Sequence, residues 1–76
     1  MKELVEYIAK HLVDQPEQVR VEEVEKDGGV EFLLHVAKED LGKVIGKNGR
    51  TARSIRALLG VVSAKEGKKA VLNIVD

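Results

Sequence analysis

At 76 residues the chain has room for a single domain over residues 1–76 with a modest core, because a domain of this size buries only about 60% of the surface that its unfolded chain exposes. The absence of cysteine excludes a disulfide framework and a thiolate metal site, and no apolar run reaches the roughly 18 residues of a membrane span. Without such a run and without a signal peptide, we expect a soluble cytoplasmic protein that does not enter a membrane.

The first expected element is a helix over residues 2–13. Apolar side chains recur there at helical spacing, and Asp14 and Pro16 then end the pattern. The apolar side chains are Leu4, Val5, Ile8, Ala9, Leu12 and Val13.

Two strands joined by a turn are expected next. Residues 19–26 are rich in valine and glutamate, but their alternation slips before Val24, which suggests a strand with a bulge near residues 22–23. The Asp-Gly-Gly sequence at residues 27–29 is typical of a turn. Apolar and polar side chains alternate over residues 30–36, so we expect a second strand that pairs with the first as a hairpin.

Two helices are expected in the second half of the chain. Asp40 is placed to cap a short helix over about Leu41–Ile45, which ends at a Gly-Lys-Asn-Gly loop. An arginine-rich helix follows the loop, because the next apolar residues again fall at helical spacing. We expect this helix to run to about Leu59 and to stop at Gly60.

A last strand is expected over residues 70–75, after a polar loop at residues 63–69. The expected order of elements is therefore α-β-β-α-α-β. This order indicates an α+β fold in which a three-stranded sheet is packed on one face by three helices.

The most informative stretch is Gly42–Arg50, where the Gly-Lys-Asn-Gly loop lies between two helical patterns. Glycine lacks a Cβ, so the main chain can turn sharply there and another backbone can come close. A helix that starts directly after such a turn offers unpaired N–H groups and the positive end of its dipole, which together form an anion site. No alternating strand pattern flanks the loop, which argues against a hairpin. A nucleotide P-loop also fails, because the glycines lie one residue too close and Asn48 replaces the Ser or Thr that binds magnesium.

The zero net charge conceals a separation of charge along the chain. Residues 1–40 hold five basic and eleven acidic side chains, a balance of −6, whereas residues 41–76 hold eight basic and two acidic ones, a balance of +6. Within residues 43–56 there is no carboxylate. The basic side chains of that segment are Lys43, Lys47, Arg50, Arg53 and Arg56. This spacing predicts a positive patch around the glycine loop.

The sequence Val-Ile-Gly-Lys-Asn-Gly at residues 44–49, followed by Arg-Thr-Ala-Arg-Ser-Ile-Arg, resembles the signature of a KH domain, whose Gly-x-x-Gly loop clamps the backbone of about four nucleotides. The resemblance runs over essentially the whole chain, and the order of elements is similar to a minimal type II KH domain. Within that group the chain is similar to the small bacterial single-KH RNA-binding proteins, the KhpA family. The resemblance implies an RNA chaperone or post-transcriptional regulator, acting alone or with a larger KH protein of the Jag (KhpB) type.

We therefore expect single-stranded RNA to bind in a groove between the glycine loop and the second strand. The candidate RNA-binding residues are Gly42, Lys43, Ile45, Gly46, Lys47, Asn48, Gly49, Arg50 and Arg53. Backbone amides near residues 46–50 would hold phosphates, Lys47 and Arg50 would add screened attraction, and the Asn48 side chain can donate hydrogen bonds. Ile45 would lie under a base, with core packing as the alternative, because either Val44 or Ile45 must face inward.

Base stacking of the kind that other RNA-binding folds use is not expected. Tyr7 and Phe32 are the only aromatic residues, and Phe32 lies in the apolar register of a strand. A few phosphate contacts and no stacking predict weak binding of low specificity.

A second surface is expected on the arginine-rich helix, where Val61 falls off the main apolar stripe. Together with Leu58 and Val62 it could form a self-complementary contact between two copies of the chain. The alternative is a fully buried helix end.

Two other classes of function have less support. An enzyme would need a catalytic arrangement, but His11 and His35 lie without partners or metal-ligand spacing, so we expect no catalysis, no metal and no cofactor. A protein-interaction adaptor with incidental RNA binding is the stronger alternative, because a fold does not determine a function. A pure adaptor, however, would have no need of a basic loop free of acidic residues.

Overall fold

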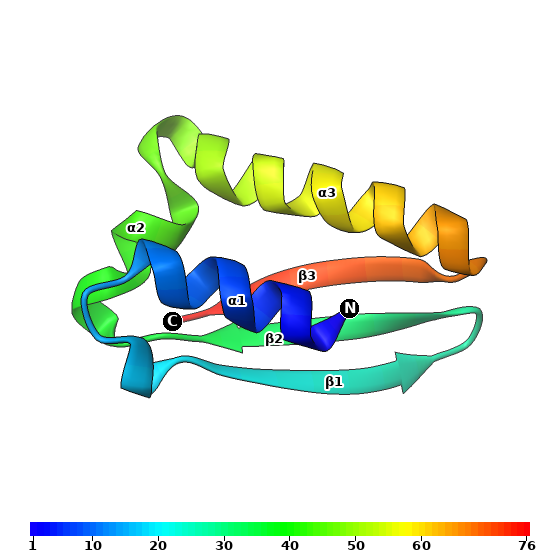
Figure 1. Ribbon diagram of the computed structural model, residues 1–76, viewed down its shortest axis with the longest axis horizontal. Helices are drawn as coiled ribbons and strands as arrows, with labels where there is room; N and C mark the ends of the chain where they lie inside the picture. Colours follow the sequence, from blue (N-terminus) through cyan, green and yellow to red (C-terminus); the bar gives the residue numbers. More distant parts are fainter.

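A three-stranded sheet forms the base of the molecule, and the helices lie on one face of it (Figure 1). The computed structural model describes all of residues 1–76. Strand β1 spans Arg20–Lys26, β2 spans Gly29–His35 and β3 spans Lys69–Val75. The strands lie in the order β1-β2-β3, with β2 antiparallel to β1 and parallel to β3. The central strand is therefore β2, and β1 and β3 are the two edges.

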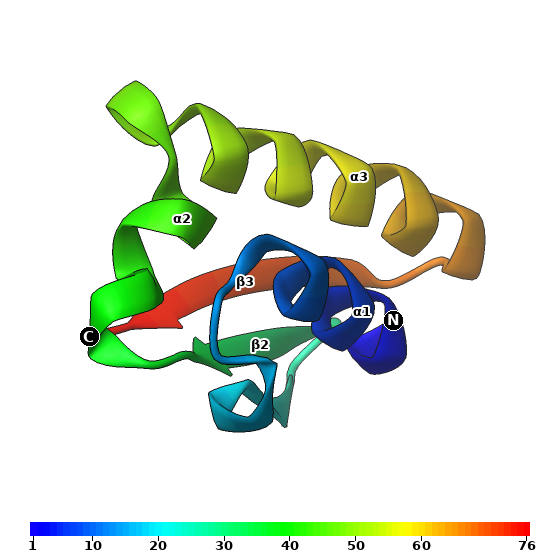
Figure 2. The same ribbon diagram turned by 60° about the vertical axis from the view of Figure 1, so that its left-hand side comes forward.

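Three α-helices complete the expected order of elements. Helix α1 spans Lys2–Leu12, α2 spans Leu41–Ile45 and α3 spans Arg50–Glu66. Figure 2 shows α3 and α1 on the same side of the sheet, with α2 at one end of α3. Helix α3 packs against β3, and α1 packs against β1. The predicted α+β fold with the order α-β-β-α-α-β is confirmed. The sequence did not indicate three additional 3-10 turns, at Pro16–Gln18, Lys38–Asp40 and Lys47–Gly49.

The core lies between the sheet and the helices. The alternation that predicted β2 places Val30, Phe32 and Leu34 on the helix side of the sheet, where all three are buried. They pack with buried apolar side chains from every other main element: Val5, Ala9, Val21, Val44, Ile55, Leu59 and Leu72. The opposite face of the sheet carries no helix, so one face is packed and the other is open to solvent (Figure 1).

The bulge expected in the first strand is wrong. Pairing between β1 and β2 is unbroken from Arg20 opposite His35 to Lys26 opposite Gly29. The alternation slips because only Val21 of this edge strand is buried under the helices, while the rest of the strand is exposed on both faces. An exposed edge strand needs no alternating apolar residues, and charged side chains there discourage pairing with other chains.

The expected end of the arginine-rich helix at Gly60 is also wrong. Helix α3 continues through Gly60 to Glu66 and ends at Gly67, whose left-handed backbone has φ 71° and ψ 21°. The Gly67 amide bonds to the Ala64 carbonyl at 3.3 Å, and the Lys68 amide bonds to the Ser63 carbonyl at 3.0 Å. An interior glycine costs a helix about 1 kcal/mol, which the burial of Leu59 and the helical turns beyond it outweigh.

The polar loop predicted over residues 63–69 shrinks accordingly to a tight turn before β3. Ser63 is buried in the last part of the helix, and its hydroxyl donates to the Gly60 carbonyl at 3.1 Å. This bond satisfies the hydroxyl inside the core, so a residue type that is usually exposed can lie on the packed face. None of the helices combines the length and the apolar character that a membrane span requires.

Candidate nucleic-acid interface

The glycine loop begins with a sharp turn that only glycine can make. The Gly46 amide closes α2 with a bond of 2.9 Å to the Gly42 carbonyl, and Gly46 itself has φ 78° and ψ 169°. A Cβ at this position would lie 2.6 Å from Thr51 Cβ and 2.7 Å from the Thr51 backbone nitrogen. Positive φ and close packing against α3 therefore both require glycine here.

The rest of the loop is a single 3-10 turn that leads directly into α3. The Gly49 amide bonds to the Gly46 carbonyl at 3.0 Å, and the Arg50 amide bonds to the Lys47 carbonyl. Asn48, with φ 57° and ψ 26°, and Gly49, with φ 74°, both adopt the left-handed conformation. The amides of Lys47 and Asn48 precede the first bond of the turn, so no carbonyl within the turn accepts them.

Positive charge surrounds these amides. Lys47, Asn48 and Arg50 are exposed, and Arg50 is the first residue of the 17-residue helix α3, whose dipole adds positive potential at this end. Arg53 lies one turn further along, and its Nη2 donates to the Asn48 carbonyl at 2.8 Å. This bond holds a guanidinium beside the loop and supports the left-handed residue.

Helix α2 presents one of its two adjacent branched residues to solvent. Val44 is fully buried in the core, whereas Ile45 is 40% exposed at the end of the helix beside the loop. The structure therefore decides between the two expected orientations, and the core-packing alternative for Ile45 is wrong. Gly42 lies on the exposed part of the same helix, and a Cβ there would meet no other atom within 4 Å.

Of the five basic residues between positions 43 and 56, only Lys43 forms ion pairs with carboxylates. Its Nζ lies 3.3 Å from Asp14 Oδ2 and 3.7 Å from Asp40 Oδ1. Lys47, Arg50, Arg53 and Arg56 form no ion pair. The free positive charge of the predicted patch therefore lies on the loop and α3, and the charge of Lys43 is compensated.

The expectation that the second strand would line the groove is wrong. Strand β2 is central, and both of its edges are paired. The strand that packs beside α3 is β3, and Arg56 Nε donates to the Leu72 carbonyl of β3 at 3.2 Å. A ligand that leaves the loop along α3 therefore meets β3. Sequence alternation predicts strands but not their order, which explains the error.

The chain is similar to known proteins over essentially its whole length. A family model described as "KhpA/KhpB, KH domain" matches residues 2–74. The chain belongs to this KH-domain family. The RNA-binding protein KhpA of Clostridium perfringens is 52% identical over 75 residues, which cover 99% of this chain and 100% of that protein. The proteins of the same name from Chlamydia pneumoniae and Aquifex aeolicus are each 46% identical over 76 residues, covering 100% of this chain and 97% and 96% of theirs. No solved structure matches the chain.

Family membership confirms the resemblance that the glycine loop and the order of elements predicted. The KH signature corresponds in the structure to the end of α2, the 3-10 turn and the first turns of α3. These are also the elements that bring the exposed amides and the free basic side chains together. Within the run that the sequence singled out, Gly42, Ile45, Lys47, Asn48 and Arg50 are exposed, and Val44 is buried.

Asp40 behaves differently from the expected helix cap. It occupies the cap position of α2, but its side chain makes no capping bond there. Its carboxylate instead accepts the backbone amides of Asp14 and Gln15, at 3.2 and 3.0 Å, from a segment about 25 residues earlier in the chain. No local pattern in the sequence indicates such a long-range contact, and the residue type alone favoured a cap.

The two histidines have ordinary side-chain partners. His11 Nδ1 donates to the Tyr7 carbonyl at 2.8 Å, with the two rings 4.3 Å apart, and His35 Nε2 lies 2.6 Å from Glu22 Oε1 across the β1–β2 pair. No group of three or more His, Cys, Asp or Glu side chains lies close enough together to hold a metal ion.

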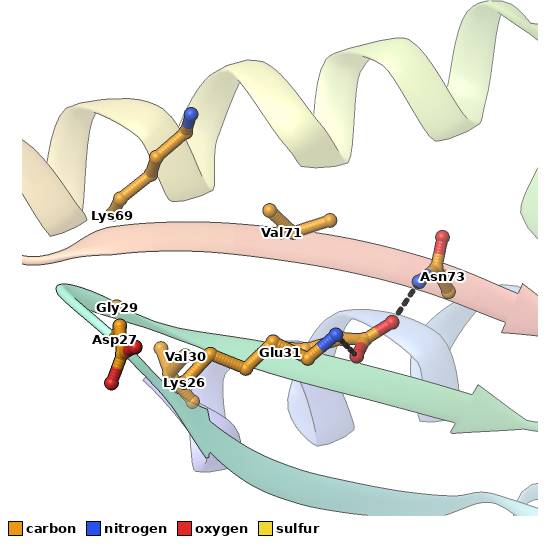
Figure 3. A pocket seen from close by; sticks show the side chains of 8 residues that line it. All are labelled: Lys26, Asp27, Gly29, Val30, Glu31, Lys69, Val71 and Asn73. Carbon is orange, nitrogen blue, oxygen red and sulfur yellow. Dashed lines mark hydrogen bonds and ion pairs between the residues drawn. The ribbon is translucent and has the colours of Figure 1, made fainter.

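A pocket of about 400 Å³ lies on the open face of the sheet, near the β1–β2 turn (Figure 3). Lys26 Nζ and Glu31 Oε1 are 2.7 Å apart there, and Asn73 Nδ2 donates to the other carboxylate oxygen of Glu31. The bond from Lys26 lowers the pKa of Glu31, and the bond from Asn73 lowers it further. The polar groups of this pocket thus satisfy one another, and none of the residues of the glycine loop lines it.

The outer side of α3 is apolar and exposed where the sequence predicted a contact between copies. Leu58 is 42% exposed and Val61 is 58% exposed, so the alternative of a fully buried helix end is wrong. Val62 is half-buried at the edge of this surface. Residues 57–64 contain no charged side chain.

Proposed function

We propose that this chain is a non-catalytic module that binds single-stranded RNA through the loop at Gly46–Gly49. The observation that carries the proposal is the exposed turn that leads into α3. The amides of Lys47 and Asn48 have no backbone partner in this turn, and the basic side chains of Lys47, Arg50 and Arg53 belong to the same turn and the first turns of the helix. Backbone amides and a helix N-terminus bind phosphate oxygens well. Flexible basic side chains add an electrostatic attraction that salt screens.

Each residue of the surface has a role in this proposal. The amides of the loop hold one or two phosphates, and Lys47 and Arg50 neutralise their charge. Asn48 donates from its side-chain amide, and Arg53 both supports the loop and adds positive potential. Ile45 offers an apolar surface for one base, and Gly42 leaves room for the RNA backbone along α2.

Single strands suit this surface better than duplexes. A short loop can grip a flexible backbone whose bases turn toward the protein, whereas duplex RNA is read across successive grooves by larger surfaces. Base stacking contributes little, because Phe32 is buried in the core and Tyr7 lies on α1 against His11. We therefore expect low base specificity.

The proposal is tested by the salt dependence of binding. Three or four phosphate contacts on a single strand correspond to a slope of log K against log salt of about −2 to −3. We expect this slope in fluorescence anisotropy with a labelled RNA of about 12 nucleotides, and weaker binding to the same sequence as a duplex. Equal affinity for a neutral-backbone analogue, or a slope near zero, would contradict backbone recognition.

In the cell we propose a cytoplasmic role as an RNA chaperone or post-transcriptional regulator. Weak binding of low specificity suits a protein that visits many transcripts, and the relatives from three bacterial genera carry the name RNA-binding protein KhpA. A protein-interaction adaptor is the second candidate. The free basic charge of Lys47, Arg50 and Arg53 favours RNA, because an adaptor has no need of an exposed phosphate-binding turn.

We also propose that α3 mediates pairing with a second copy or with a larger KH protein of the Jag (KhpB) type. Leu58 and Val61 project from an uncharged stretch of the helix, and Gly60 between them has open space where a side chain would be. Two such helices can approach closely in a two-fold arrangement, which buries the same side chains on both copies. The family model spans KhpA and KhpB, which supports a KH partner.

The substitution Val61→Glu tests this pairing. A carboxylate on each copy would meet its counterpart across the two-fold axis, so we expect a monomer at tens of micromolar in sedimentation velocity, with the melting temperature of the monomer unchanged. Val71→Glu is the control, because Val71 is also exposed but lies on the open face of the sheet. A wild-type protein that sediments as a monomer at that concentration would contradict self-association.

A further inference from the structure

Asp40 is the only charged side chain that the fold buries. It is 1% exposed, and each of its carboxylate oxygens accepts a backbone amide from the connection between α1 and β1, one from Asp14 and one from Gln15. A buried carboxylate is costly unless it is hydrogen-bonded and paired with a cation. An apolar residue at this position would leave the amides of Asp14 and Gln15 without these acceptors.

Lys43 supplies the positive charge. It lies one helical turn after Asp40, with Nζ 3.7 Å from Asp40 Oδ1, and a second carboxylate, that of Asp14, holds it from the exposed side at 3.3 Å. No other basic side chain forms an ion pair with Asp40. Removing Lys43 would leave Asp40 buried without a counter-charge.

The location of this cluster links it to the glycine loop. Helix α2 has only five residues, which is too short to be stable by itself, so contacts with the rest of the fold must set its position. Val44 packs into the core from its middle, and Asp40 ties its start to the connection after α1. The end of the same helix carries Ile45 and leads into Gly46.

We propose that Asp40 is a positioning residue for the RNA-binding loop and that Lys43 is its counter-charge rather than a contact with RNA. This rests on the proposed function of the loop. It assigns Lys43, which directly precedes the KH signature, to the fold and leaves phosphate binding to the amides of the loop, Lys47 and the arginines of α3. It also explains why, among the basic residues between positions 43 and 56, only Lys43 forms ion pairs with carboxylates.

A pair of matched substitutions separates the two roles. Lys43→Gln and Lys47→Gln remove the same charge from neighbouring positions of one surface. We expect Lys43→Gln to lower the melting temperature by about 5 °C and to leave the salt slope of RNA binding unchanged. We expect Lys47→Gln to leave the melting temperature unchanged and to make the slope shallower by about 0.7, the loss of one phosphate contact. Equal changes of slope in the two variants would overturn the assignment of Lys43.

The positioning role of Asp40 needs a second comparison, because its replacement also destabilises the fold. Asp40→Asn keeps the shape but sets an amide NH₂ against a backbone N–H, so we expect a fall of roughly 5–10 °C in melting temperature. Val30→Ala, in the core near the far end of β2, is the control of similar instability. At a temperature where both are folded, we expect Asp40→Asn to bind RNA about tenfold more weakly than Val30→Ala, because a displaced loop loses its geometry.

The outcomes distinguish this inference from the proposed function. Equal RNA affinity of Asp40→Asn and Val30→Ala would overturn the positioning role, while the binding of the wild-type protein would still support the loop. Lys47→Gln that binds with an unchanged slope would instead contradict the proposed function itself.

Asp14→Asn completes the series, because its exposed side chain is dispensable in this scheme and its backbone amide still donates to Asp40. We expect its melting temperature to stay near that of the wild type, and a loss equal to that of Asp40→Asn would overturn the role of the buried carboxylate.

Discussion

Replacing Lys47 and Asn48 together by aspartate is expected to abolish RNA binding without affecting the fold. The double substitution puts two negative charges where the proposed phosphate lies and removes a cation from the same turn. The new carboxylate at position 48 can also pair with Arg53, which would withdraw a second positive charge from the ligand. We expect affinity in fluorescence anisotropy to fall by about 100-fold, or below detection.

The fold should survive this change because neither side chain packs against the core. Both residues are exposed, and aspartate tolerates the left-handed backbone of position 48 nearly as well as asparagine. The melting temperature and the far-UV circular dichroism spectrum should therefore match those of the wild type. The control is Lys2→Asp with Gln18→Asp, which makes the same change in net charge outside the loop, at the start of α1 and in the first 3-10 turn. Equal losses of affinity in the two double variants would mean that the overall charge of the protein, and not the loop, causes the loss. Unchanged binding in the loop variant would contradict the assignment of the loop as the RNA-binding site.

The shape of the loop and its immediate flanks could be predicted from sequence because local rules determine them. Glycines at positions 46 and 49, with Asn48 between them, are residues that accept positive φ, and all three adopt it. The charge pattern indicated the exposed basic side chains in the same way. A surface built from consecutive residues needs no knowledge of tertiary structure, and this is why the exposed turn and the basic residues beside it could be expected from the sequence.

The errors arose where tertiary contacts override a local preference. Gly60 is a helix breaker in isolation, but Leu59 and Ser63 bury one side of α3 beside it, and the helix continues. Asp40 favours a cap by residue type, but two amides about 25 residues away bind its carboxylate. The order of the strands, and hence the identity of β3 as the strand beside α3, depends on pairing that alternation does not encode.

Gly46→Ala is expected to cause the largest loss of stability among single substitutions in the loop. The methyl group would have to fit where Thr51 Cβ and the Thr51 backbone nitrogen lie 2.6 and 2.7 Å away, on a backbone with φ 78°. A positive φ combined with ψ 169° is essentially restricted to glycine and costs an alanine about 1–3 kcal/mol, and the overlap adds about 1–3 kcal/mol. For a domain of this size the sum corresponds to a fall in melting temperature on the order of 15 °C, measurable by calorimetry.

Gly67→Ala is the matched control for this prediction. Gly67 has a similar φ of 71°, but a Cβ there would meet no atom within 4 Å, and the residue lies at the opposite end of α3. Alanine tolerates the left-handed backbone of Gly67, with ψ 21°, better than the backbone of Gly46, with ψ 169°. The difference between the two variants therefore measures the packing of Gly46 against Thr51 together with this larger conformational cost. Thr51→Ala should relieve only part of the strain in Gly46→Ala, because the Cβ and the backbone nitrogen of residue 51 both stay in place. Equal melting temperatures for Gly46→Ala and Gly67→Ala would mean that the loop moves away from α3 at little cost, and the rigid presentation of its amides would then have to be abandoned.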